Sequence, residues 1–331
     1  MGGGFGGAIR VTGGALQVQR TSAQSLFDGN HADIGGAISF AGTTLNIDQT
    51  TFSNNSATLS GGALEMTQGA VTIQNTTIGP NNNAKLGGGF YLQTVAKLTQ
   101  VTISKNTASV RGGAGWVGSG GKIQKGTNVT IDGDIAGPGA GLGGGAPSQG
   151  GGIYVEDGGT VELINTIVAD CSADQGPDIF GTITSDGHNL ISDSSGGSGY
   201  VGSDILNVNA LLDNLGPNGG PTLTQMPFRN SPAVDAGDDL AAPGPWDQRG
   251  VGYPRIAGDH IDIGAVELQP TDPQYNINGV GGASRAATIQ TADSTSGGTT
   301  KNKEHFAPRL GAASMATTAE QILINLSSEC R

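Results

Sequence analysis

The sequence predicts an all-β protein, a right-handed parallel β-helix of about six glycine-marked coils with about 25 residues each. Two sequence markers recur about once in each coil. One is a glycine pair followed by a small and an apolar residue, as in Gly35-Gly36-Ala37-Ile38. The other is an apolar residue three places before Asn or Asp. Between the markers apolar and polar residues alternate, as in Val71-Thr72-Ile73-Gln74, which is the period of a β-strand.

The second marker predicts two columns of side chains that run from coil to coil. Its members are Phe27/Asn30, Phe52/Asn55, Ile78/Asn81, Ile103/Asn106, Ile131/Asp134 and Ile167/Asp170. We expect the apolar members to stack inside the coils. The Asn members should occupy left-handed corners and hydrogen-bond to each other as structural residues, with a ligand-binding ladder as the alternative. The glycine pairs should supply positive φ and allow close approach of neighbouring coils.

Composition narrows the class of protein. Gly makes up 59 of 331 residues without a Gly-X-Y period, so collagen is excluded. Hydrophobic residues amount to 35% and aromatic residues to 5%, which favours a narrow aliphatic core over a helical bundle. The formal charge of −12 repels phosphates, so we expect no nucleic-acid partner. No run of about 18 apolar residues occurs, and we expect no membrane-spanning segment.

The markers resemble the repeats of the polymorphic outer-membrane proteins, whose passenger domains are β-helical. The later part of the chain resembles the choice-of-anchor Q domain proteins. The segments that carry this second resemblance are Gly176-Pro177-Asp178-Ile179, Gly187-His188-Asn189-Leu190-Ile191, Gly216-Pro217-Asn218-Gly219-Gly220-Pro221-Thr222, Ser231-Pro232-Ala233-Val234-Asp235-Ala236-Gly237, Asp247-Gln248-Arg249-Gly250 and Asp262-Ile263-Gly264-Ala265-Val266-Glu267. The resemblance implies a bacterial, exported protein, extracellular or at the cell surface. No signal peptide is visible in residues 1–20.

Composition shifts predict three parts. Residues 1–173 should form the coils. Residues 174–268, rich in Pro and Asp-containing turns, should be a capping module, because the end of a β-helix exposes unpaired strand groups and an open core. Residues 269–331 are dominated by Ala, Thr, Ser, Gly and Asn, and we interpret them as a linker or disordered tail. A capping-box pattern in this tail predicts a short helix over 317–326.

Asp132 and Asp134 are the candidate catalytic or Ca²⁺-binding carboxylates, because a glycoside hydrolase needs two carboxylates at one bond. Arg249 is a candidate base or substrate clamp of a lyase. The simpler account makes it structural, in a buried ion-pair network of the module. The partners expected in that network are Asp235, Asp247 and Asp262.

Trp116 and Trp246 are the candidate sugar-binding residues, because an indole face packs well on a pyranose ring; burial in the core or module is the alternative. The four histidines lack metal-ligand spacing, so we expect no metal site and no cofactor, with Ca²⁺ as the open alternative.

Two functions fit these observations. The first is a non-enzymatic, exported β-helical surface or adhesin-like protein that presents polar faces to a glycan or a cell-surface protein. The second is a polysaccharide lyase or glycoside hydrolase of the pectate-lyase-like type. A groove in which carboxylates converge would favour the second.

Overall fold

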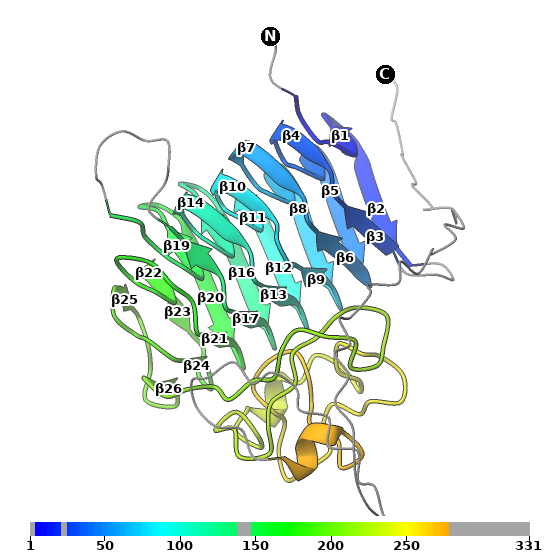
Figure 1. Ribbon diagram of the computed structural model, residues 1–331, viewed down its shortest axis with the longest axis vertical. Coiled ribbons are helices and arrows are strands. Elements are labelled where there is room, and N and C mark those ends of the chain that lie inside the picture. The colour runs from blue at the N-terminus through cyan, green and yellow to red at the C-terminus, as the bar shows by residue number, and fades with distance from the viewer. Residues whose placement is uncertain (1–3, 21–24, 138–146, 278–331) are drawn as a thin grey trace, which may run out of the picture. The chain divides into compact units, whose positions relative to one another are not determined.

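The computed structural model describes residues 4–20, 25–137 and 147–277. These residues form 26 strands and two short 3-10 helices, η1 (Asp239–Ala241) and η2 (Pro273–Asn276). No α-helix occurs in these ranges, and none of their helices is long or apolar enough to cross a membrane. Successive coils pair through parallel strands, so the predicted all-β parallel β-helix is confirmed. Figure 1 shows these strands stacked side by side along the coils.

Three sheets make up the coils. The five-stranded sheet contains β4 (His31–Ile34), β7 (Ser56–Ser60), β10 (Asn83–Leu86), β14 (Thr107–Arg111) and β18 (Ile135–Ala136). The eight-stranded sheet contains β3 (Ser25–Asp28), β6 (Thr50–Ser53), β9 (Thr77–Ile78), β13 (Thr102–Ser104), β17 (Thr130–Asp132), β21 (Ile167–Ala169), β24 (Leu190–Ile191) and β26 (Ile205–Leu206).

The 13-stranded sheet forms the third side, and most coils contribute two segments to it. Its strands are β1 (Ile9–Val11), β2 (Ala15–Gln19), β5 (Ile38–Asp48), β8 (Leu64–Gln74), β11 (Phe90–Leu92), β12 (Val95–Thr99), β15 (Gly115–Val117), β16 (Lys122–Thr127), β19 (Ile153–Val155), β20 (Thr160–Ile164), β22 (Ile179–Thr182), β23 (Thr184–Ser185) and β25 (Gly197–Ser198).

The glycine pairs form the corners between the five-stranded and the 13-stranded sheets. Gly61, between β7 and β8, has a φ of 62°. A β-carbon on Gly62 would overlap the carbonyl oxygen of Gly88 in the next coil. The first glycine therefore supplies the left-handed backbone, and the second makes room for the neighbouring coil.

The predicted interior column is confirmed. Phe52 pairs with Phe27 on one side and with Ile78 on the other, and Ile78 pairs with Ile103. All four are buried, and the two phenyl rings stack with centroids 5.0 Å apart. Ile131 continues the column, but the next member is Val168 rather than Ile167, because Ile131 pairs with Val168.

An amide ladder runs beside this column. The side-chain nitrogen of each Asn donates to the side-chain oxygen of the next member, over 2.8–2.9 Å, through Asn30, Asn55, Asn82, Asn106 and Asp134. The prediction of Asn81 was wrong, because this coil has one extra residue between Ile78 and the ladder. The prediction that ladder residues occupy left-handed corners was also wrong, because the residue before the ladder position has the positive φ, as Asn54 and Asn81 do.

Asp170 belongs to this left-handed set and not to the ladder. Its φ is 50°, and Cys171 follows it at the ladder position, since Val168 and not Ile167 lies in the interior column. The predicted pair Ile167/Asp170 was therefore displaced by one residue.

The coils continue beyond residue 173. Strands β22, β24 and β26 pair in parallel with their predecessors, so the stack reaches Leu206 and the boundary expected at 173/174 lies inside it. Gly176 has a φ of 58° and takes the corner position three residues before Ile179.

The irregular segment 207–277, called the module below, lies along the eight-stranded sheet rather than on the end of the stack. The Thr102 hydroxyl donates to Gln248 Oε1 (2.7 Å), and Thr130 Oγ1 accepts from the Ala265 amide (2.9 Å). Thr77 bonds to the Leu223 carbonyl oxygen. These threonines lie on successive strands and are buried. The expectation that the module caps the end was wrong, because this outer face of the coils is what it covers.

Arg249 is buried in the module. Its guanidinium forms salt bridges with Asp247 (2.7 Å) and Asp272 (3.0 Å) and donates to the Glu267 carbonyl oxygen (2.6 Å). The Tyr253 ring lies 4.0 Å from its central carbon. Of the three partners expected from the sequence, Asp247 is paired with it.

Asp235 and Asp262 interact with each other instead. The Asp235 amide donates to Asp262 Oδ1 over 2.7 Å, and the Leu268 amide donates to Asp262 Oδ2. Burial raises the pKa of Asp262 to about 6.

The module extends past the expected boundary at 269. Asp272 and Gln274 are buried, and Gln274 donates to Asp213 Oδ2 (2.8 Å). The segment 270–277 is therefore anchored to the module through Asp272 and Gln274 and is not a linker. The rest of the predicted tail, including the helix over 317–326, lies outside the described residues.

The first prediction concerns this boundary. A chain that ends after Gln269 loses Asp272, so its free energy of unfolding should fall by about 1.5–3 kcal/mol, as for a lost hydrogen bond to a charged group. The measurement is urea unfolding of this chain beside a control that ends after Ile277 and keeps Asp272. Equal stability of the two truncated chains would contradict the structural role of Asp272.

The second prediction concerns pH. Burial raises the pKa of Asp132 to about 7, with Asp170 and Asp178 adding to this rise. A carboxyl with a raised pKa in the folded state contributes stability below about pH 4 that is lost as pH rises through about 7. Asp132→Asn removes this titration and keeps an oxygen for the Gln225 side chain, which donates to Asp132 Oδ2 (2.6 Å).

The free energy of unfolding of Asp132→Asn should match that of the wild type near pH 4. At pH 8 it should exceed the wild-type value by about 2–4 kcal/mol, with a correspondingly higher melting temperature. The control is Asp33→Asn, because hydrogen bonds from Thr58 and Gly4 lower the pKa of Asp33, in the opposite direction to that of Asp132. The control should lower stability at pH 8 and lower it slightly less near pH 4, because a carboxyl with a lowered pKa contributes stability that is lost as pH falls. Parallel pH curves for Asp132→Asn and the wild type would count against the buried titration.

Candidate functional site

The two candidate carboxylates of the coils are buried. Asp132, at the end of β17, is 8% exposed and lies under the module, where it accepts from Gln225. Asp134 is fully buried at the end of the amide ladder, and burial raises its pKa well above the usual range. Asp134 Oδ1 accepts from Asn106, whereas Oδ2 has no partner among the described residues. Arg249 is 2% exposed, so none of the three candidate catalytic side chains faces an open surface.

No group of three or more His, Cys, Asp or Glu side chains suited to a metal ion occurs in residues 4–20, 25–137 and 147–277. The Ca²⁺ alternative therefore has no assigned ligand set within these ranges.

Trp246 and Trp116 differ in their surroundings. Trp246 is 37% exposed in the module, where its backbone forms an isolated antiparallel β-bridge with Pro254. Trp116 is 6% exposed and lies on the outer side of the 13-stranded sheet. Its indole nitrogen has no hydrogen-bond partner in the described part of the chain.

Trp116 is one of four aromatic residues in a single outward column, called the aromatic column below. Its members are Tyr91 on β11, Trp116 on β15, Tyr154 on β19 and Phe180 on β22, and each is paired with the next or linked to it by ring contact. Each stands between inward-facing neighbours, as Tyr91 does between Phe90 and Leu92. The alternation of a strand therefore places all four rings on the outside.

The rings stack mainly on each other. Trp116 meets Tyr154 edge-on at 4.8 Å, and Tyr154 is parallel to Phe180 at 5.5 Å, with 7° between the ring planes. Phe180 is half-buried and ends the column. Because Gly181 pairs with Gly197, the next position in the column is Gly196, which has no side chain. The far face of the Phe180 ring is thus not covered by another ring of the column.

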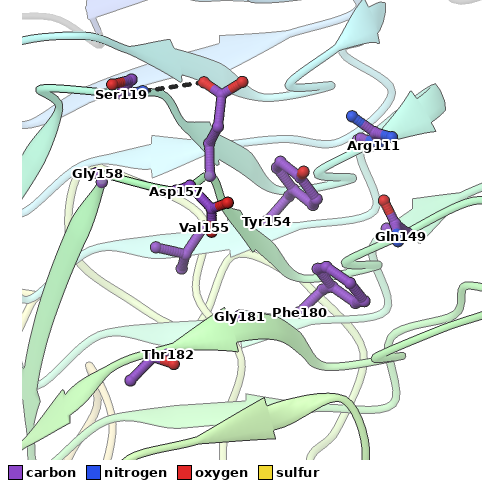
Figure 2. Close-up of a pocket in the computed structure, with 12 residues that line it drawn as sticks. Arg111, Ser119, Gln149, Tyr154, Val155, Asp157, Gly158, Phe180, Gly181 and Thr182 are labelled. Atoms are coloured by element: carbon purple, nitrogen blue, oxygen red, sulfur yellow. Dashed lines mark hydrogen bonds between the residues drawn. The ribbon is translucent and has the colours of Figure 1, made fainter.

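A groove of ≈ 620 Å³ opens beside the last two rings (Figure 2). Its lining residues are Arg111, Ser119, Gln149, Tyr154, Val155, Glu156, Asp157, Gly158, Gly159, Phe180, Gly181 and Thr182. Arg111 is the last residue of β14, and Gln149 lies in the next coil before β19, where the two form an isolated parallel bridge. Glu156 and Asp157 come from the turn after β19. Figure 2 shows Arg111 and Gln149 on one side of the Tyr154 and Phe180 rings and Asp157 on the other.

The groove's charged side chains are held in different ways. Arg111 lies over the aromatic column, with its central carbon 5.0 Å from the Tyr154 ring and 5.8 Å from the Trp116 ring. Glu156 Oε2 accepts from the Ser119 amide over 2.9 Å, which fixes the turn. Burial raises the pKa of the Tyr154 hydroxyl, against the opposite effect of Arg111. The groove therefore combines ring edges and one ring face with hydrogen-bonding groups on both sides.

Of the two predicted tryptophans, Trp116 belongs to the aromatic column and Trp246 does not. The sequence analysis missed Tyr154 and Phe180. The sequence contained a signal for them. In four coils the second residue of the strand that follows the glycine corner is aromatic, as in Ile153-Tyr154-Val155 and Ile179-Phe180-Gly181.

Residues 49–65 match the Chlamydia polymorphic membrane protein repeat. This segment contains Phe52, Asn55 and the Gly61–Gly62 corner, so the match falls on the structural markers of one coil. No curated protein and no solved structure matches the chain. The match does not reach 176–267, where the resemblance to the choice-of-anchor Q domain proteins stays an interpretation. The chain is thus a parallel β-helix with a polymorphic membrane protein repeat, which points to a surface or outer-membrane protein.

Proposed function

We propose that this protein is an exported, non-enzymatic surface protein of adhesin-like type that binds a glycan in the groove beside Tyr154 and Phe180. The observation that carries the proposal is the half-buried Phe180 ring, whose far face meets no further ring of the aromatic column, beside a groove with polar side chains on both sides. A sugar ring has an apolar face for stacking and hydroxyl groups at its rim, so it matches both features.

Two further observations support a surface location. The repeat match is to a membrane protein family, and the charged fraction of 13% leaves a surface rich in hydroxyl and amide groups. The proposal needs no cofactor. It places the ligand on the coils, while the buried charges of the module hold the module together.

The third prediction tests this proposal. Phe180→Ala removes the stacking face, so affinity for a bound oligosaccharide should fall about tenfold, because burial of a phenyl side chain is worth roughly 1.5–3 kcal/mol. The control is Phe5→Ala, because Phe5 is also partly exposed and contacts an arginine, Arg10, at 4.2 Å. A glycan panel identifies the ligand, and titration calorimetry then measures binding to the three proteins.

Loss of binding in Phe180→Ala alone, measured well below the melting temperature of each protein, supports the glycan site. Equal loss in both variants, or a wild type that binds no member of the panel, would overturn it. The same panel is assayed for cleavage, with and without a Ca²⁺ chelator. Turnover of any polysaccharide would favour the lyase or hydrolase alternative, and selective capture of a cell-surface protein would favour a protein ligand.

A further inference from the structure

Arg111 gives the groove a charge preference. It is the only basic side chain among the described residues that line the groove, and the described residues contain no salt bridge to it. The rings of Tyr154 and Trp116 position its guanidinium, and its Nε atom is buried without a hydrogen-bond partner. With Nε buried, an arginine placed by ring contacts keeps the N–H donors of its two terminal nitrogens available, and a carboxylate accepts them in a planar, bidentate geometry.

The opposite side of the groove limits how many anionic groups can bind. Glu156 and Asp157 line that side, and the whole chain carries a formal charge of −12. A ligand with a carboxylate on every sugar would place one beside Arg111 and another beside these two acids. Like charges brought together across an interface are unfavourable, and the net charge adds repulsion at longer range.

We infer that the ligand of this groove is a saccharide with a single carboxylate, held by Arg111, joined to neutral sugar units that lie toward Phe180 and the Glu156–Asp157 turn. The carboxylate belongs to a uronic acid or to a sialic acid, which share this chemistry. The inference rests on the proposed glycan-binding function and adds the charge class of the ligand.

The test compares probes that differ in one carboxylate. Sialyllactose is paired with lactose, and xylotriose with one glucuronosyl substituent is paired with xylotriose, so the two sources of the carboxylate are separated. Oligogalacturonate serves as the polyanion. The acidic member of at least one pair should bind about tenfold to a hundredfold more tightly, as expected for a charge-assisted hydrogen-bonded pair. Oligogalacturonate should bind more weakly than that member.

Arg111→Met removes the charge and keeps an apolar stem over the rings. In this variant the acidic and neutral members of the pair should bind equally, with the neutral affinity unchanged. The matched control is Lys85→Met, which removes one positive charge from β10 in the five-stranded sheet. The control should keep the full preference, which excludes an effect of net charge alone.

The outcomes separate this inference from the proposed function. Equal wild-type affinity within both pairs, or tightest binding of oligogalacturonate, overturns the single-carboxylate ligand and leaves glycan binding intact. A preference that survives in Arg111→Met also overturns it. If no saccharide binds the wild type, or if Phe180→Ala binds saccharide as tightly as the wild type, the proposed function fails and the inference fails with it.

Discussion

Close stacking of successive coils is the constraint on which the rest of this structure depends. Each coil must lie one strand spacing from the next, so that the parallel strands can pair along their whole length. The glycine corners permit this approach, because a β-carbon at Gly62 would overlap the next coil. The same spacing brings Phe27 onto Phe52 inside and Tyr154 onto Phe180 outside. Interior core, amide ladder and aromatic column are thus consequences of one repeat distance.

Stacking also explains where the buried acids occur. The ladder needs an acceptor at its last position, and Asp134 accepts there from both the backbone and the side chain of Asn106. Asp132 points outward from the neighbouring strand and is enclosed when the module covers the eight-stranded sheet. Desolvation is the largest cause of the raised pKa in both. Their perturbed titration therefore reflects packing, and it does not by itself mark a catalytic pair.

The module and the groove divide the charged residues between two tasks. Arg249, Asp247 and Asp272 are enclosed together, and each charge is met by an opposite charge or a hydrogen bond. Such a network is costly to break, because removal of one member leaves another buried and unpaired. Arg111 differs, since ring faces hold it and none of the described acids pairs with it. An unpaired cation beside an open groove is the feature from which we derive ligand preference.

The sequence by itself determined the coil architecture, the interior column from Phe27 to Ile103 and the role of the glycine pairs, because these depend on local spacing alone. Prediction from the sequence was wrong where one inserted or shifted residue changes the register, as at Asn82 and Cys171. Strand pairing, and not a fixed residue interval, decides which side chains share a column. Only the tertiary structure decided that the module covers a flank, because the outward threonines of that face look like solvent-exposed strand residues in the sequence. It alone also brought Arg111 over the Trp116 and Tyr154 rings of the aromatic column, because residues a whole coil apart become neighbours only when the coils stack.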